Sequence, residues 1–153
     1  MIRIASRAAP TILALSAALA PASAFAALGG DLASVMRDND ALGAHHSVTP
    51  FTAYDLHEST TAGGAILRQY VDRGGHVFAV TWRGRTAPDV HALLGEHAAK
   101  YQALAQAQRT SHAIVNVAED GLRVTVMRMP RGWQFAATLP NAIPAGVSHA
   151  ELR

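Results

Sequence analysis

Apolar and polar residues follow two periods along the chain, and these periods divide it into helices and strands. From Asp31 to about Leu42, Leu32, Val35 and Met36 recur at helical spacing. Asp31 is placed to cap the first N–H groups, and Gly43 is placed to end the helix. The polar stretch that follows, with His45-His46 and Thr49-Pro50, is interpreted as a loop.

Three segments with strand character come next, over residues 51–58, 66–71 and 76–82. Paired glycines lie between them, and glycine supplies the positive φ that tight hairpin turns need. In the third segment, strict alternation would place Phe78, Val80 and Trp82 on one face, and Val77, Ala79 and Thr81 on the other. The pattern predicts a three-stranded antiparallel meander.

A second helix is predicted from Thr86, as N-cap of a capping box, to about Gln108. Its apolar face carries Val90, Leu93, Leu94, His97, Tyr101 and Leu104. Gly95 weakens this helix, so close packing against the sheet is the expected reason for a glycine there. Strands are predicted over residues 113–117, 122–128 and 133–139, followed by a tail, 140–153, along the surface.

The predicted fold is therefore α+β: one antiparallel sheet, or two joined ones, in the order α-βββ-α-βββ, with one main helix packed on the sheet. Residues 75–81 and 132–138 share four of seven identities, Gly, Phe, Ala and Thr. Duplication of an αβββ unit would explain this echo, and so would chance, since strands that leave a glycine turn look alike.

The first 26 residues have the pattern of a secretory signal peptide. Arg3 and Arg7 precede a short apolar run, and small-x-small sites allow cleavage after Ala24 or Ala26. The apolar run is too short to cross a bilayer. We therefore expect residues 1–26 to be removed and residues 27–153 to form a single domain in the periplasm or the medium, with Leu28 to Gly30 as a flexible arm or a linker.

Composition then limits the function classes. Without residues 1–26 the chain has 13 − 2 = 11 cationic and 11 acidic side chains, and ten of the eleven cations are arginine. No block of like charge exists in the sequence, so we expect no nucleic-acid partner and no binding to an anionic membrane surface. Because the apolar run is short, we also expect no integral membrane span. The chain has no cysteine, which excludes disulfides, thiol catalysis and cysteine metal ligands.

Several short motifs in a fixed order resemble a known family. They are Ala27-Leu-Gly-Gly30, Arg68-x-Tyr70, Gly75-x-Val-Phe-Ala-Val80-x-Trp82, Pro88-Asp89, Leu93-Leu-Gly95, Leu139-Pro140 and Pro144-Ala-Gly-Val-Ser148. The chain resembles, over nearly all of residues 27–153, the proteobacterial exported family catalogued as domain of unknown function 2844. The resemblance implies an exported single-domain protein, and it brings no activity, cofactor or catalytic residue.

Eight histidines suggest a metal site as one alternative. Imidazole binds divalent transition metals, and His45, His46, His57 and His76 are the residues that folding would have to bring together. Scattered surface histidines are the competing interpretation. A small envelope hydrolase is a further alternative, although the sequence has no nucleophile elbow, zinc-protease helix or phosphate loop.

The strands carry the residues of the preferred hypothesis, a non-enzymatic binding module. If one sheet face is uncovered, Tyr70, Trp82 and Trp133 with Arg68 form a surface for a partner. The expected partner is another envelope or secreted protein, bound through the sheet without a cofactor.

Overall fold

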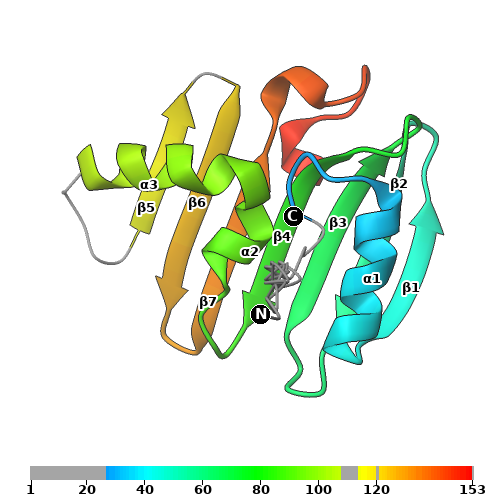
Figure 1. Ribbon diagram of the computed structural model, residues 1–153, viewed down its shortest axis with the longest axis horizontal. Coiled ribbons are helices and arrows are strands. Elements are labelled where there is room, and N and C mark those ends of the chain that lie inside the picture. Colours follow the sequence, from blue (N-terminus) through cyan, green and yellow to red (C-terminus); the bar gives the residue numbers. More distant parts are fainter. Residues whose placement is uncertain (1–26, 108–113, 120, 153) are drawn as a thin grey trace, which may run out of the picture.

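The computed structural model describes residues 27–107, 114–119 and 121–152 (Figure 1). The proposed signal peptide lies outside the described residues, as do Gln108 at the predicted end of the second helix and Ala113 at the predicted start of a strand. The architecture is α+β, as the sequence predicts: helices lie on one face of a single antiparallel sheet (Figure 1).

The sheet has seven strands in the order β1-β2-β3-β4-β7-β6-β5, and every neighbouring pair is antiparallel. The strands are β1 (His45–Pro50), β2 (Tyr54–Thr60), β3 (Ile66–Asp72), β4 (Val77–Gly84), β5 (Ile114–Glu119), β6 (Leu122–Met129) and β7 (Gly132–Thr138). The first predicted strand thus begins three residues later than expected, because the Phe51 N–H donates to the Tyr54 carbonyl in a turn.

The loop predicted around His45-His46 is wrong: these residues begin β1. This strand pairs only with β2, at one edge of the sheet, and five of its six side chains are exposed. An edge strand with no buried face carries no apolar alternation, so the period-2 signal is absent. Pro50 at its end fits an edge position, where a missing backbone N–H is tolerated.

The pairing of β4 with β7 joins two meanders at the centre of the sheet. In this pair Val80 lies opposite Ala137, and the sequence echo aligns the same two residues. A rotation by half a turn about that pair would superpose Ala79 on Ala136 and Thr81 on Thr138. The register agrees with this symmetry, because it pairs Ala79 with Thr138 and Thr81 with Ala136. The arrangement fits a duplicated αβββ unit, which stays a prediction.

The first helix, α1 (Leu32–Leu42), has the predicted ends. The Asp31 carboxylate accepts a hydrogen bond from the Ser34 N–H at 2.8 Å, and Gly43 ends the helix in the left-handed conformation. The same hydrogen bond lowers the pKa of Asp31, because it stabilises the charged carboxylate.

The second predicted helix is divided into α2 (Val90–Leu94), a 3-10 turn (Gly95–His97) and α3 (Ala98–Ala107). Its N-cap is Asp89, not Thr86, because the Asp89 carboxylate accepts the Ala92 N–H at 3.0 Å. Among the described residues, no helix has the length and apolar content needed to cross a membrane.

The segment from Ala27 to Gly30 is not a flexible arm or a linker. Leu28 is buried, and its N–H donates to the Leu93 carbonyl. Gly29 and Gly30 exchange backbone hydrogen bonds with Val77, each at 2.8 Å. Gly95 packs against this segment and not against the sheet, since a Cβ on Gly95 would lie 2.3 Å from the Ala27 Cβ.

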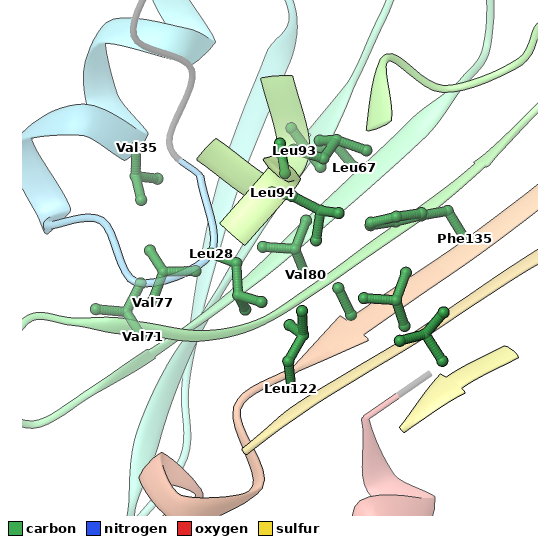
Figure 2. Packing of buried hydrophobic residues seen from close by; sticks show 14 residues of the cluster. Leu28, Val35, Leu67, Val71, Val77, Val80, Leu93, Leu94, Leu122 and Phe135 are labelled. Atoms are coloured by element: carbon green, nitrogen blue, oxygen red, sulfur yellow. The ribbon is translucent and has the colours of Figure 1, made fainter. Parts of the chain in front are cut away.

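The main hydrophobic core lies between the sheet and the helices (Figure 2). Leu93 and Leu94 of α2 contact the cluster formed by Leu67, Val80 and Phe135 of the central strands (Figure 2). Burial of this apolar surface supplies the main driving force for folding.

The predicted alternation in β4 is wrong at Phe78. The register between β3 and β4 shifts, so that Val77 pairs with Val71 while Ala79 pairs with Tyr70. Phe78 is the extra residue of this bulge and packs with Ala79, whereas Val77 packs with Val80 in the main core. A bulge reverses the face of every residue beyond it.

A second apolar cluster lies on the other face of the sheet, beneath the C-terminal segment, residues 140–152. Tyr54, Tyr70 and Phe78 meet there with ring centroids 5.7 to 6.2 Å apart. Leu152 is buried against them, at 5 % exposed. The predicted surface tail therefore covers part of the sheet and belongs to the packed structure.

We expect Gly95→Ala to destabilise the protein by roughly 3 kcal/mol, because it combines backbone strain with overlap against Ala27. Gly43→Ala is the matched control: it has the same φ of 52°, a ψ of 33° that other residues tolerate, and open space around it. It should cost only about 1 kcal/mol. Urea unfolding of both variants measures the difference, and equal losses would contradict the assigned packing.

Candidate functional site

The two faces of the sheet carry different candidate residues. The register places Arg68 and Tyr70 of β3 on the face away from the helices, which we call the open face. Trp82 and Trp133 lie on the helix face, where Trp82 packs against the main core and its indole N–H donates to the Thr86 carbonyl. The structure therefore does not bring the four predicted binding residues together on one surface.

A cavity of about 760 Å³ opens between the C-terminal segment and strands β2 and β3. We call it the tail cavity. Its lining is mostly apolar and aromatic, and consists of Phe51, Thr52, Ala53, Tyr54, Leu56, Arg68, Tyr70, Ala145, Gly146, Val147 and Glu151. Its volume lies within the range of small-molecule sites.

Aromatic rings form one wall of the tail cavity. Phe51 stacks on Tyr54 with ring centroids 4.7 Å apart, and Phe51 is 43 % exposed. Burial, with a smaller effect of the nearby Glu151 carboxylate, raises the pKa of Tyr54. Tyr70 is buried, so it contributes to the cavity floor and not to an exposed surface.

Two ion pairs fix the polar groups beside this cavity. Arg68 Nε donates to Glu58 Oε2 at 2.6 Å across strands β2 and β3. Arg73 pairs with Asp55 at 2.9 Å and also donates to the backbone carbonyls of Thr52 and Phe51. Arg73 thereby holds the turn that carries Phe51 in place, although exposed ion pairs of this kind contribute little stability themselves.

Further hollows lie along the sheet beyond the tail cavity. Arg68 also lines a neighbouring hollow of about 320 Å³, which it shares with Ile66, Trp82 and Gln134. A third hollow, of about 350 Å³, lies beyond it and reaches Trp133 at the ends of β4 and β7. The four predicted binding residues thus line three different hollows: Arg68 and Tyr70 line the tail cavity, Arg68 and Trp82 line the second hollow, and Trp133 lines the third.

Of the four candidate metal ligands, the structure brings two together. His46 and His57 lie on adjacent strands, with Nε2 and Nδ1 3.2 Å apart in a hydrogen bond. His45 is exposed and faces the opposite side of β1, and His76 lies at the turn between β3 and β4. Within the described parts of the chain, no group of three histidine, aspartate or glutamate side chains could hold a metal ion.

Two adjacent pairs on β1 and β2, His46 with Ser47 and His57 with Glu58, combine an imidazole with a hydroxyl or a carboxylate, as acid–base catalysis requires. Neighbouring residues of a strand point to opposite faces. His57 is buried on the helix face, whereas Glu58 pairs with Arg68 on the open face. The sheet therefore separates the members of each pair.

Polar side chains are buried where α1 crosses β2 and β3. Asp38, Asn39, His57, Ser59 and Gln69 are each at most 5 % exposed. The Ser59 hydroxyl donates to the Asn39 side-chain carbonyl. Buried polar groups of this kind destabilise a fold unless hydrogen bonds compensate them. We call this set the α1 polar cluster.

Burial changes the titration of two members of the α1 polar cluster. It raises the pKa of Asp38 to about 7, against smaller opposing effects of Arg37 and of a hydrogen bond with Gln69. Burial also lowers the pKa of His57, helped by His46 and opposed by Asp55. Both shifts favour the uncharged form, as expected for groups removed from water.

Sequence reasoning missed both the tail cavity and the α1 polar cluster. A local signal existed for the cluster: Asp38 and Asn39 follow Val35 at three and four residues, so they share its inward face. The tail cavity had no such signal, because it forms between segments about 90 residues apart in the chain.

Comparison with known proteins gives one match. A family model described as "Protein of unknown function (DUF2844)" matches residues 24–152, in agreement with the resemblance noted from the sequence. No curated protein and no solved structure matches the chain.

We expect Asp38→Asn to stabilise the protein more at about pH 8 than at about pH 5. The folded-state pKa of about 7 lies above the usual 3.8, so the folded form keeps a proton that the unfolded chain has lost. The stability linked to this proton is lost as pH rises from 3.8 through 7, and asparagine removes the effect. Between the two pH values the gain should grow by roughly 2–3 kcal/mol.

Urea unfolding at both pH values measures this change. Asp40→Asn is the matched control, since it makes the same replacement at an exposed residue of the same helix. If Asp38→Asn changes the free energy of unfolding by the same amount at both pH values, Asp38 is ionised in the folded protein.

Proposed function

The chain belongs to the DUF2844 family of proteins of unknown function, and from this premise we propose that it is an exported, non-enzymatic binding module. It binds through the open face of the sheet. The observation that carries the proposal is the tail cavity of about 760 Å³, lined by aromatic and aliphatic side chains between the sheet and the C-terminal segment.

Two features of the chain support export. The segment before residue 27 has the charge, apolar run and small-residue sites of a signal peptide. The family match begins at residue 24, close to the proposed cleavage sites after Ala24 and Ala26. The absence of cysteine means that the domain folds by packing alone in an oxidising compartment.

The lining of the tail cavity indicates the chemistry of its ligand. Phe51, Leu56 and Val147 present apolar surface, and Tyr54 adds an aromatic ring to the wall. Because Glu58 already pairs with Arg68, and Glu151 adds a negative charge, the cavity does not favour an acidic ligand. It fits an uncharged, ring-bearing group, either free or carried by an envelope component.

Processing of the leader is the first test. Protein recovered from the periplasm of an export-competent bacterium should begin at Phe25 or Ala27, as measured by intact mass. Replacing both Ala24 and Ala26 by arginine should block cleavage and leave the chain attached to the membrane fraction. An unprocessed chain beginning at Met1 in the cytoplasm would overturn the proposed export.

Binding of the neutral dye N-phenyl-1-naphthylamine tests the tail cavity. Its fluorescence should rise and saturate at one dye per chain, because the ring enters an apolar site. Ala145→Trp places a bulky side chain on an exposed lining position and should weaken binding at least about tenfold, as expected when a site is filled.

Ala142→Trp is the matched control, because Ala142 is exposed on the same segment and does not line the cavity. Circular dichroism verifies that both variants are folded. Absence of saturable binding to the folded protein, or an equal loss in both variants, would overturn the assignment of the tail cavity as the binding site.

A further inference from the structure

Four arginines gather at the end of the sheet where the β6–β7 turn lies beside the end of β4. Arg83 and Arg85 come from β4 and the residues after it, and Arg128 and Arg131 come from β6 and the turn. Arg85, Arg131 and Trp133 line both of two adjoining hollows, of about 350 and 700 Å³, whereas Arg83 lines the first hollow and Arg128 lines the second. We call these five residues the arginine site, and we propose that it binds an acidic polysaccharide through its carboxylate groups.

The backbone brings the two pairs of arginines together. Gly84 pairs with Trp133 at the end of the β4–β7 ladder. A Cβ on Gly132 would lie 2.3 Å from the Gly84 carbonyl oxygen. Glycine at position 132 therefore lets the turn approach β4 more closely than a residue with a side chain could. The pairs are 43 residues apart in the sequence, and this contact brings them to the same end of the sheet, with Arg83 on the open face and Arg128 on the helix face.

The charge of the arginine site is not neutralised by the protein. Among the residues that the structure describes, no acidic side chain lines either hollow. In the described part of the chain, the arginines that pair with acidic side chains are Arg68 and Arg73, and none belongs to the site. Four of the ten arginines after residue 26 therefore concentrate positive charge in a protein whose processed chain has no net charge.

The side-chain chemistry indicates the ligand. Guanidinium groups bind carboxylates with two parallel hydrogen bonds, which a lysine cannot provide. Arg128 lies 5.7 Å from the centroid of the Trp133 ring, so the aromatic ring orients one of the cations. Two hollows side by side fit a chain whose acidic groups are spaced along it, such as a polymer of uronic acids, better than the flat surface of a bilayer.

The proposal goes beyond the tail cavity and does not depend on it. The tail cavity and the arginine site have no lining residue in common. The variant Ala145→Trp should therefore leave binding at the arginine site unchanged, so that failure of one proposal is distinguishable from failure of the other.

Calorimetric titration with hexagalacturonate at low ionic strength tests the arginine site. The double variant Arg85→Gln/Arg131→Gln should bind at least about tenfold more weakly, because two charge-assisted contacts are lost. Arg85→Lys/Arg131→Lys keeps the charge without the paired geometry and should lie between this variant and the original protein. All replaced side chains are exposed, and thermal unfolding verifies that the variants are folded.

Arg123→Gln is the matched control, since Arg123 is an exposed arginine at the other end of β6. Its affinity should stay within about twofold of the original, as expected for a charge outside the site. Absence of hexagalacturonate binding, an equal loss in the control, or equal binding of neutral maltohexaose would overturn the proposal. Tighter arginine-dependent binding of phosphatidylglycerol vesicles or of an oligothymidylate would overturn it in favour of a membrane or a nucleic acid.

Discussion

The backbone pairing of β4 with β7 is the contact on which the rest of the structure depends. It joins two meanders that the helical crossover separates in sequence, and it places Val80 opposite Ala137 in the main core. Pairing between segments so far apart in the chain carries a large loss of chain entropy. Burial of Phe135 and Val80 beneath Leu94 offsets that loss, so the sheet and its helical cover stabilise each other (Figure 2).

The two faces of this sheet are covered in different ways, and the difference places the candidate sites. Helices cover one face, and in the described chain the C-terminal segment covers part of the other (Figure 1). A short segment that reaches the sheet through Leu152 and Val147 leaves space beside its contacts, and that space is the tail cavity. On the helix face, polar groups such as Asp38 and His57 are buried, and removal from water shifts their pKa values toward the uncharged forms.

The distribution of charge also follows from the central pairing. A chain with equal numbers of cationic and acidic groups after residue 26 has no basic block in its sequence. Where β4 and the β6–β7 turn meet, however, four arginines line two adjoining hollows, and no acidic residue in the described part of the chain lines either hollow. A local cluster of charge can therefore direct the binding of a charged partner even where the net charge of the chain is zero.

Periodicity by itself determined the elements whose residues alternate or repeat within one segment. The capped helix α1, strand β3, strand β6 and the α+β class follow from local spacing, because a buried face leaves its period in the sequence. The edge strand β1, the bulge at Phe78 and the break at Gly95 did not follow. Each depends on a contact with a distant segment or, for β1, on having no buried face.

The same distinction applies to the candidate sites. The sequence singled out Arg68 and Tyr70, which line the tail cavity, and it grouped with them Trp82 and Trp133, which belong to the helix face. The sequence could not decide whether a given side chain lies on the helix face or on the open face, since a single bulge moves every later residue of the strand to the opposite face. Only the tertiary structure decided that the C-terminal segment forms a cavity and that distant arginines meet, because both arise from contacts between residues far apart in the chain.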